Sequence, residues 1–297
     1  MGTPQGKDHR LPAPGDTGPS LSLAKRLKSA GLSPRHSLGQ HFLISSRVID
    51  SIVKAASGFA GILEIGPGPA VLTAPLCQAS QLVALELDEG LAAFAAQEAP
   101  GADIRRMDAL LADWREILAS LPGPRGIVSN LPYQITGPLL GRCAECHDLI
   151  AGAVLMMQKE VAVRITALPG DSARGYLSVW LQGVFEISTV CDAPPGCFLP
   201  PPKVDSSVLR FVPKADAPES ALLSFVKKGF AQPRKTLHNN LKPLGVTAEA
   251  FAGTGLSPSV RPHQLTMEQW QAHHQIHASS AQASSRVRSS LASAMLQ

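Results

Sequence analysis

The sequence predicts a mixed α/β fold built on a doubly wound, mostly parallel β-sheet. Short apolar runs recur at a regular interval in the first half of the chain, and they are separated by segments long enough for a helix, such as "EGLAAFAAQEA". The runs are "GILEI" (61–65), "QLVALEL" (81–87), "ADIRRMD" (102–108) and "GIVSN" (126–130). Strands that alternate with helices at this spacing are typical of right-handed βαβ units.

The residues at the ends of these runs predict a single ligand-binding edge, because ligands bind beyond the carboxyl ends of the strands in such a sheet. Gly66 and Gly68 follow the first run, where the absence of a side chain lets the backbone approach a ligand closely. Glu86 lies near the end of the second run, about 20 residues after Gly66, where an acidic side chain can accept hydrogen bonds from ribose hydroxyls. Asp108 and Asn130 end the third and fourth runs. Together they indicate a nucleoside-containing cofactor.

Each of these residues also has a purely structural explanation, since a Gly-Pro-Gly turn can be a tight loop and an acidic residue can cap the next helix. Their occurrence at four successive strand ends favours a binding site. The segment "GPGPAV" places Val71 where a dinucleotide fingerprint has its third glycine or alanine. This departure weakens the case for a dinucleotide and favours S-adenosylmethionine, which carries a nucleoside but no phosphate.

Composition sets limits on the class of protein. The chain has 297 residues, 44% of them hydrophobic and 17% charged, which predicts a largely globular protein with more than one domain. The net charge of +4 permits a nucleic-acid partner without demanding one. Five cysteines without a signal peptide indicate a reducing, cytoplasmic location, and no apolar run approaches the roughly 20 residues of a membrane span.

Two short patterns resemble metal or haem sites. "CAECH" at 143–147 matches the haem-attachment spacing or half of a zinc site, but no second well-spaced cysteine pair accompanies it. "HHQIH" at 273–277 lies near a polar tail and is expected to be surface. We therefore expect no metal.

The composition also predicts how the chain is organised. Residues 1–36 are rich in proline and glycine and predict a flexible extension, and residues 279–297 are a low-complexity Ser/Ala-rich tail. The pattern changes near residue 213, where a strand-rich stretch gives way to helices. We expect a cofactor-binding domain over 37–212 and a helical domain over 213–278.

A series of motifs in this order resembles the ribosomal RNA adenine dimethyltransferase family over about residues 37–270. The motifs are "SLGQHFL", "LEIGPG", "LELD", "MDAL", "NLPYQIT", "LMMQKEVAVR", "YLSVWLQ", "FLPPPKVDSSV" and "PRKTLHNNLK". The resemblance implies a Rossmann-like class I methyltransferase sheet with an antiparallel last strand, followed by a small helical C-terminal domain.

The same resemblance implies roles for individual residues. The cofactor contacts that it implies are His41, Leu43, Gly66, Glu86, Asp108 and Asn130. The catalytic residues that it implies are Asn130 and the main-chain carbonyl of Leu131, which would accept the two hydrogens of the target amine, with Tyr133 and Phe198 as aromatic walls around the base. Position 41 is commonly asparagine in the family, so histidine there is a departure.

The implied activity is S-adenosylmethionine-dependent N6,N6-dimethylation of two adjacent adenosines near the 3′ end of small-subunit (16S) ribosomal RNA, linked to small-subunit biogenesis. The implied partner is this RNA within an assembly intermediate, and we expect a monomer. Three alternatives are a dinucleotide-dependent oxidoreductase, a non-catalytic RNA-binding assembly factor and a large-subunit adenine methyltransferase. "NLPY" and the absent third glycine weigh against the oxidoreductase, and the intact Asn130, Tyr133 and Glu86 weigh against a non-catalytic factor. The wording of "FLPPPKVDS" and "MQKEV" favours the small-subunit enzyme over the large-subunit one.

Two groups of basic residues could contact RNA phosphates or could simply be solvated. They are Lys25, Arg26, Lys28 and Arg35 near the start, and Lys227, Lys228, Arg234, Lys235 and Lys242 in the helical domain. Lys228, Lys235 and Lys242 share a helical face only if Pro233 does not interrupt the helix. Pro233 and His238 depart from the more basic run that is usual in the family.

Overall fold

The computed structural model describes residues 23–35, 39–247, 251 and 253–279. Most of the predicted N-terminal extension, and nearly all of the predicted tail, lie outside these residues. Within the predicted extension, Leu23–Ser29 form helix α1. Leu27 of α1 is buried in a small cluster with Phe42, Leu91 and Phe94, so this part of the segment is packed against the rest of the chain.

The structure confirms the mixed α/β class with a mostly parallel central sheet. Among the described residues, a seven-stranded sheet has the order β4-β3-β2-β5-β6-β9-β7. The strands are β2 (Gly61–Ile65), β3 (Gln81–Glu86), β4 (Asp103–Arg106), β5 (Arg125–Asn130), β6 (Gly152–Gln158), β7 (Phe185–Ala193) and β9 (Ser206–Pro213). β2 pairs in parallel with β3 and β5, β3 with β4, and β5 with β6. The four apolar runs of the sequence are therefore the four strands at one side of the sheet.

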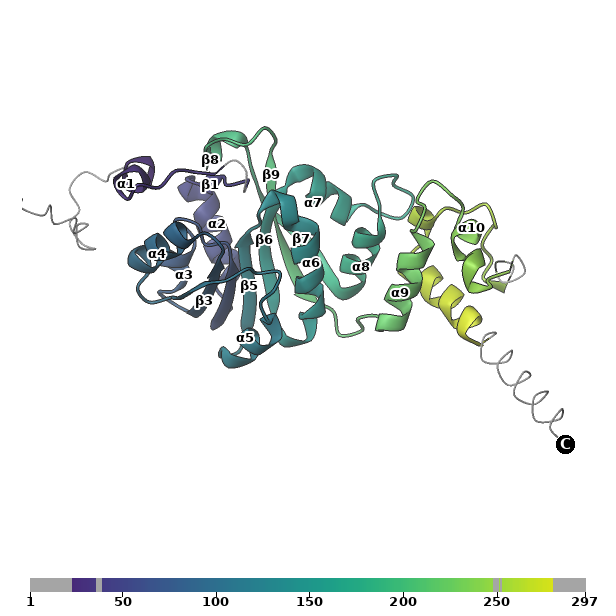
Figure 1. Cartoon of the computed structure of the whole chain (residues 1–297). Helices are drawn as coiled ribbons and strands as arrows, with labels where there is room; N and C mark the ends of the chain where they lie inside the picture. Colours follow the sequence, from purple (N-terminus) through teal and green to yellow (C-terminus); the bar gives the residue numbers. More distant parts are fainter. Residues whose placement is uncertain (1–22, 36–38, 248–250, 252, 280–297) are drawn as a thin grey trace, which may run out of the picture. The chain divides into compact units, whose positions relative to one another are not determined.

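Helices lie on both sides of this sheet (Figure 1). They are α2 (Ser46–Ala56), α3 (Thr73–Leu76), α4 (Glu89–Glu98), α5 (Trp114–Ser120) and α6 (Thr136–Glu145). The side chain of Asp88 caps α4 by accepting from the Leu91 N–H, and Asp113 caps α5 in the same way. Helix capping at the end of β3 is thus done by Asp88, which leaves the preceding Glu86 to other contacts.

A short antiparallel ladder joins two distant segments. β1 (Phe42–Leu43) pairs with β8 (Phe198–Leu199), with Phe42 opposite Leu199 and Leu43 opposite Phe198. Leu43 and Phe198 both belong to the main hydrophobic core, together with residues of β2, β5 and β6. The ladder therefore fixes the segment before α2 against the segment that precedes β9.

The chain divides into two compact units, residues 1–158 with 189–210, and residues 159–188 with 211–297. The second unit holds α7 (Lys159–Thr166), α8 (Tyr176–Val184), α9 (Ser220–Gly229), α10 (Leu237–Leu241) and helical residues 267–279. The chain passes from the first unit to the second for the last time after residue 210, close to the boundary expected at 213. Residues 159–188 were expected in the first domain but group with the C-terminal helices. Across the described parts of the chain, no helix has the length and apolar character that crossing a membrane requires.

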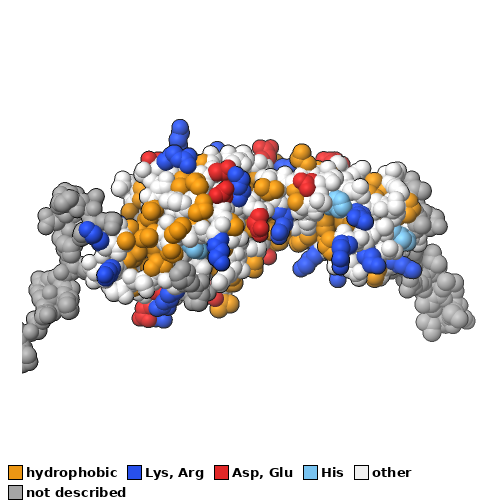
Figure 2. Space-filling view, turned by 90° about the horizontal axis from the view of Figure 1, so that it is seen from above, with side chains coloured by type: hydrophobic (Ala, Val, Ile, Leu, Met, Phe, Trp, Pro, Cys, Tyr) orange, Lys and Arg blue, Asp and Glu red, His pale blue; other side chains and the backbone are white. Residues whose placement is uncertain are grey.

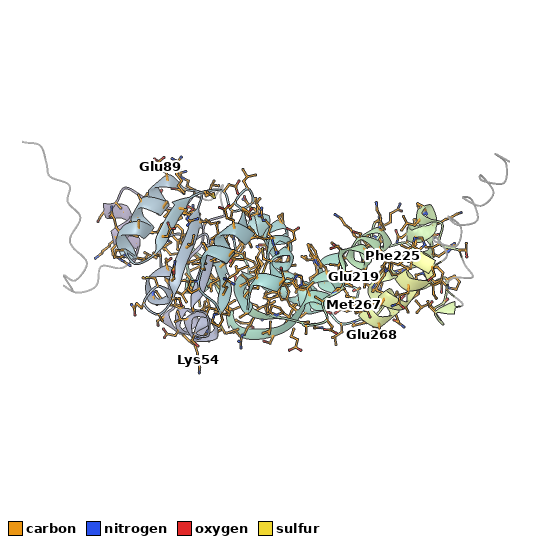
Figure 3. All side chains as sticks on the ribbon, turned by 90° about the horizontal axis from the view of Figure 1, so that it is seen from below. Lys54, Glu89, Glu219, Phe225, Met267 and Glu268 are labelled. Atoms are coloured by element: carbon orange, nitrogen blue, oxygen red, sulfur yellow. The ribbon has the colours of Figure 1, made fainter. Side chains whose placement is uncertain are left out.

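The second unit has its own aromatic core. Phe225 of α9 lies beside the helical residues 267–279 (Figure 3) and packs edge-on against Trp270, at 6.3 Å between ring centroids. The prediction that "HHQIH" is surface was wrong for His273, which is 1% exposed and lies 4.4 Å from the Phe251 ring. His273 lies one helical turn beyond Trp270, so it shares the buried face.

Pro233 separates α9 from α10, because α9 ends at Gly229 and α10 begins at Leu237 after its cap Thr236. Lys228, Lys235 and Lys242 therefore do not form a stripe along one helix. The side-chain amide of Asn240 instead fixes the intervening turn, accepting from the Gln232 N–H and donating to its carbonyl.

We predict that acid destabilises the second unit through His273. Burial lowers the pKa of His273, as does the nearby His277, and neither ring nitrogen of His273 has a hydrogen-bond partner. Below about pH 6.5 the imidazole therefore binds a proton in the unfolded chain but not in the folded chain. This difference lowers the free energy of unfolding by up to about 1.4 kcal/mol for each pH unit. Urea unfolding at pH 7.5, 6.5 and 5.5, followed by circular dichroism, should show the stability of His273→Leu relative to the parental protein rising as the pH falls.

The variant His273→Leu should lack the contribution of His273 to this pH dependence, because an apolar side chain of similar size has no proton to bind. His263→Leu, in the same unit, is the control and should keep the parental dependence, since His273 is still present. An equal loss of stability on acidification in the parental protein and in His273→Leu would contradict the assignment.

Candidate active site

A pocket lies at the carboxyl ends of the parallel strands, where the sequence predicted a ligand-binding edge. It belongs entirely to the first unit. Its lining comes from the ends of four adjacent strands and from the segment before α2, namely residues 39–43, 64–69, 71–72, 85–87, 91, 107–109 and 130–135. The structure thus brings His41, Leu43, Gly66, Glu86, Asp108, Asn130, Leu131 and Tyr133 together.

Glu86 holds the turn that follows β2. One of its carboxylate oxygens accepts the Gly68 N–H at 3.0 Å, and the other accepts the Asp88 N–H at 2.9 Å. Gly66 and Gly68 have φ values of +66° and +53°, which side-chain-bearing residues rarely adopt, and a Cβ at Gly68 would lie 3.4 Å from the Phe42 ring. Burial raises the pKa of Glu86, and the two N–H donors oppose that rise.

Glu86 also joins the end of β3 to the end of β4. The main-chain carbonyl of Glu86 accepts the Met107 N–H at 2.9 Å, which brings Asp108 beside the pocket. Asp108 closes its own turn by accepting from the Leu110 N–H at 2.8 Å. Leu87 and Met107, which are 56% and 41% exposed, present apolar surface at the edge of the pocket. This combination of an acid, a turn and two apolar side chains suits a nucleoside.

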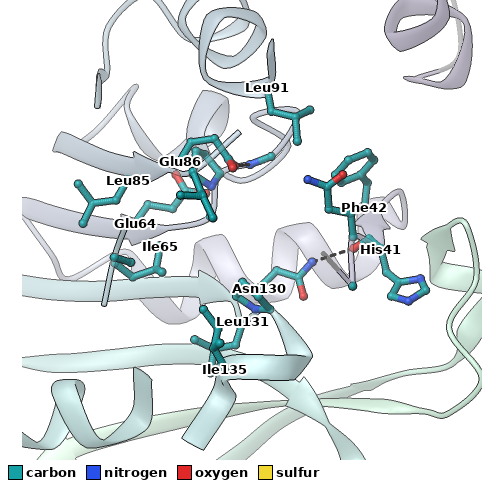
Figure 4. Close-up of a pocket in the computed structure, with 18 of the residues that line it drawn as sticks. His41, Phe42, Glu64, Ile65, Leu85, Glu86, Leu91, Asn130, Leu131 and Ile135 are labelled. Carbon is teal, nitrogen blue, oxygen red and sulfur yellow. Dashed lines mark hydrogen bonds between the residues drawn. The ribbon is translucent and has the colours of Figure 1, made fainter. Parts of the chain in front are cut away.

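Asn130 has a fixed orientation at the end of β5. Its side-chain nitrogen donates to the main-chain carbonyl of His41 at 3.1 Å (Figure 4). Because a carbonyl can only accept, the amide nitrogen must face His41, and the amide oxygen is left as an acceptor. Just below, the Ser129 hydroxyl donates to the Ile65 carbonyl at 2.6 Å and so ties β5 to β2 under the pocket.

Tyr133 is held by contacts to its hydroxyl and to one face of its ring. Its hydroxyl lies 2.8 Å from the hydroxyl of Ser206, a buried residue at the start of β9. Its ring stacks on the imidazole of His41, with centroids 5.6 Å apart and planes inclined by 24°. Burial raises the pKa of Tyr133, so the hydroxyl stays protonated and can hydrogen-bond to Ser206.

Phe198 is the one predicted site residue that the structure does not bring to the pocket. It is 2% exposed, pairs with Leu43 across the β1–β8 ladder and belongs to the main core. Leu43 is also fully buried, but it reaches the pocket wall. The aromatic wall in this structure is therefore formed by Tyr133 with His41.

Glu64 is a pocket residue that the sequence analysis did not identify. It lies in the middle of β2, is 1% exposed, and has one carboxyl oxygen without a hydrogen-bond partner. Burial, reinforced by the charge of Glu86, raises its pKa to about 8, so that it is largely protonated at neutral pH. An acid inside the otherwise apolar run "GILEI" was the available signal.

Ser206 was missed as well, because 73 residues separate it from Tyr133 and no local pattern connects them. The cysteines of "CAECH" are free and buried. Within the described residues, no cluster of three or more His, Cys, Asp or Glu side chains could hold a metal ion.

The pocket fits S-adenosylmethionine in its chemistry. Each Glu86 oxygen uses one lone pair on a backbone N–H and keeps another, so both can accept from ribose hydroxyls. The glycine turn provides a close backbone approach, and Leu87 and Met107 provide apolar surface for a base. Asn130, whose amide oxygen is left as an acceptor, lines the same pocket.

Comparison with known proteins places this geometry in a family. The family model described as "Ribosomal RNA adenine dimethylase" matches residues 31–278. Ribosomal RNA small subunit methyltransferase A of Acinetobacter baylyi is 40% identical over 254 residues, which cover 82% of this chain and 92% of the relative. The protein of the same name from Deinococcus radiodurans is 37% identical over 282 residues, which cover 89% and 95%.

Solved structures are similar in the same way. A dimethyladenosine transferase from Plasmodium falciparum matches with a TM-score of 0.69 at 23% identity, over 78% of this chain and 96% of that one. The 23S rRNA methyltransferase ErmE matches with a TM-score of 0.61 at 26% identity, over 80% and 99%. Both likenesses extend over most of the chain.

We predict that Glu64 makes the protein less stable as the pH rises. Its pKa is raised from 4.5 to about 8, so the folded state holds a proton that the unfolded state releases. The contribution of Glu64 to stability should therefore fall between about pH 4.5 and pH 8, by up to about 1.4 kcal/mol per pH unit. Glu64→Gln mimics the protonated acid and should be the more stable protein at pH 8.5 in urea unfolding.

Asp50→Asn, which neutralises an exposed carboxyl on α2, serves as the control and should follow the parental curve. The interpretation fails if Glu64→Gln loses stability in parallel with the parental protein between pH 6 and pH 8.5.

Proposed function

The chain belongs to the ribosomal RNA adenine dimethylase family, and we propose on that basis that it dimethylates N6 of two adjacent adenosines near the 3′ end of small-subunit ribosomal RNA. Its cofactor is S-adenosylmethionine, and the chain is an enzyme rather than a scaffold. The observation that carries the proposal is the Asn130 side chain, whose amide nitrogen is engaged by His41 so that its oxygen serves as an acceptor.

The cofactor-binding side of the pocket is the side of Glu86. In this proposal Glu86 accepts from the ribose, Asp108 lies at the adenine, and Gly66 lets the backbone approach the rest of the cofactor. When bound, S-adenosylmethionine supplies an electrophilic methyl group on a positively charged sulfur. Leu43 and the main chain at His41 close the pocket toward the target base.

The chemical task of the protein is to orient a weak nucleophile, because the lone pair of an exocyclic adenine amine is delocalised into the ring. The Asn130 oxygen and the Leu131 carbonyl would accept the two amine hydrogens and so fix the nitrogen in line for attack. Pro132 follows directly and sets the direction of the Leu131 carbonyl. The amine loses a proton once it has been methylated, and water suffices to take it.

The target base would stack on Tyr133. A base must leave its own stack to enter such a pocket, and an aromatic face offsets that cost by roughly 1 to 3 kcal/mol. Ser206 and His41 hold the ring before any base arrives. Phe198 would support this wall only from within the core, through its pairing with Leu43.

The second unit would hold the RNA. Lys and Arg side chains gather over the C-terminal helices (Figure 2). The five basic residues that the sequence predicted as phosphate contacts in the helical domain are all exposed. They are Lys227, Lys228, Arg234, Lys235 and Lys242. The N-terminal group is partly neutralised, since Arg26 pairs with Glu98 and Arg35 pairs with Asp88 at 3.0 Å. We therefore assign most phosphate contacts to the C-terminal group.

The small subunit is favoured over the large one by sequence. Identity is 37–40% with proteins named for small-subunit methylation, over 82% to 89% of this chain. The proposal extends to an assembly intermediate of the small subunit as the substrate, and to a monomer that acts in the cytoplasm. Mass spectrometry of small-subunit RNA, from cells with and without the gene, tests the activity directly.

We predict that Asn130→Ala impairs methyl transfer, whereas Glu86→Gln impairs cofactor binding. Asn130→Ala removes an acceptor that matters in the reacting geometry, so single-turnover methyl transfer should fall by about 100-fold or more while most cofactor affinity is kept. Glu86→Gln loses the charge that accepts from the ribose, so cofactor affinity measured by calorimetry should fall by about tenfold or more. Unmethylated small-subunit particles are the substrate.

Each variant is the control for the other, since both lie in the same pocket. Parental transfer rates in Asn130→Ala would refute its role in orienting the amine. Parental cofactor affinity in a folded Glu86→Gln protein would refute the ribose contact.

We also predict that the double variant Arg234→Ala/Lys235→Ala weakens binding to the particles without altering cofactor affinity. Losing two phosphate contacts should lower the slope of log affinity against log salt by roughly 2 units, or less on structured RNA. Arg47→Ala/Lys54→Ala, which removes two exposed charges from α2, is the matched control. Equal slopes in the two double variants would remove the C-terminal group from the RNA interface.

A further inference from the structure

His41 lines the pocket and contacts two segments that are distant from it in the sequence. Its Nδ1 atom lies 2.8 Å from the Pro200 carbonyl oxygen, and its ring stacks on Tyr133. Its own carbonyl accepts the amide of Asn130. One residue thus links the segment before β1, the "NLPY" segment and the segment after β8.

The imidazole has a defined orientation. The Pro200 carbonyl can only accept, so Nδ1 carries the hydrogen and donates it. The main chains on both sides are fixed as well, because Phe42 and Leu199, the neighbours of His41 and Pro200, are paired in the β1–β8 ladder. The ring plane is therefore set by the protein before RNA binds.

The fixed imidazole in turn orients the ring of Tyr133. Stacking on His41 fixes one face, and the contact with the buried Ser206 hydroxyl fixes the far end. Two torsion angles define a tyrosine side chain, and two anchors suffice to hold them. His41 covers one face of the ring, and we take the opposite face to be the one that receives a base.

We propose that the His41 side chain is a positioning residue for the target adenine, which backs the Tyr133 ring and does not bind the cofactor. The proposal rests on the proposed function, because it takes the stacked ligand to be that adenine. It assigns the side chain a role different from the cofactor contact that the family resemblance implies for position 41.

The physical gain is pre-organisation. A free tyrosine ring would have to be ordered as the base enters, and each ordered side chain subtracts from binding. The asparagine common at this position could donate to the Pro200 carbonyl, but it offers no ring face to Tyr133. The stacked pair is therefore a consequence of the histidine in this chain.

A double-mutant cycle tests the coupling. The proteins are the parental chain, His41→Ala, Tyr133→Ala and the double variant, and the measurement is single-turnover methyl transfer to unmethylated small-subunit particles. We expect His41→Ala to slow transfer about 3- to 10-fold in the parental background and less than about 2-fold in the Tyr133→Ala background. Cofactor affinity in His41→Ala should stay within about 2-fold of the parental value.

Two further variants separate stacking from the hydrogen bond. His41→Phe keeps a ring and loses the donor, whereas His41→Asn keeps a donor and loses the ring. We expect His41→Phe to transfer methyl groups faster than His41→Asn. His147→Ala is the control, because His147 is also half-buried with Nδ1 2.9 Å from a main-chain carbonyl, that of Ala144, outside the pocket.

A spectroscopic measurement follows the contact independently of activity. The chain has only two tyrosines, Tyr133 and Tyr176, so a protein labelled with 3-fluorotyrosine gives two fluorine resonances that Tyr133→Phe assigns. His41→Ala should shift the Tyr133 resonance through loss of the stacked ring and leave that of Tyr176 in place. His147→Ala should shift neither.

The outcomes distinguish the possibilities. Independent, multiplying effects of His41→Ala and Tyr133→Ala would overturn the proposal, as would an equal loss of cofactor affinity and transfer in His41→Ala, or an unmoved Tyr133 resonance. If the parental protein does not methylate the particles although the resonance shifts, the proposed function fails and the adenine role fails with it. In that case only the packing of Tyr133 on His41 would stand.

Discussion

The pocket depends on one buried residue, Glu86, that joins three strand ends through its carboxylate and its main-chain carbonyl. Glu86 accepts the Gly68 N–H and the Asp88 N–H with its side chain and the Met107 N–H with its main-chain carbonyl. Unpaired, these buried groups would each cost roughly 1 to 3 kcal/mol. The turn after β2, the start of α4 and the segment leading to Asp108 therefore share a single anchor. Any ligand that Glu86 holds is placed relative to all three.

A second set of contacts fixes the other end of the pocket. Ser129 ties β5 to β2, and the His41 carbonyl determines which way the Asn130 amide faces. This end uses neutral groups, whereas the Glu86 end uses acids. The division matches the two ligands of a methyl transfer, a positively charged donor and a neutral amine, and it arises from the order of residues at the ends of adjacent parallel strands.

Much of this could be predicted from sequence, because strand periodicity and the polar residues at strand ends are local patterns. β2, β3, β4 and β5 coincide with the four apolar runs, and Gly66, Glu86, Asp108 and Asn130 lie where a doubly wound sheet requires them. Contacts between distant segments could not be predicted. His41 and Pro200 are 159 positions apart, and the placement of Phe198 in the core follows from the β1–β8 ladder. His273 was mispredicted because its polar neighbours along the chain concealed the helical spacing from Trp270.

The use of an amide at position 130 follows from these contacts. A carboxylate there would also offer acceptors to an amine, but one of its oxygens would face the His41 carbonyl, and two acceptors cannot share a hydrogen bond. An asparagine avoids this clash, since its nitrogen satisfies the carbonyl and its oxygen is thereby left as an acceptor. The backbone of the segment before β1 therefore favours an amide at position 130 and sets its orientation.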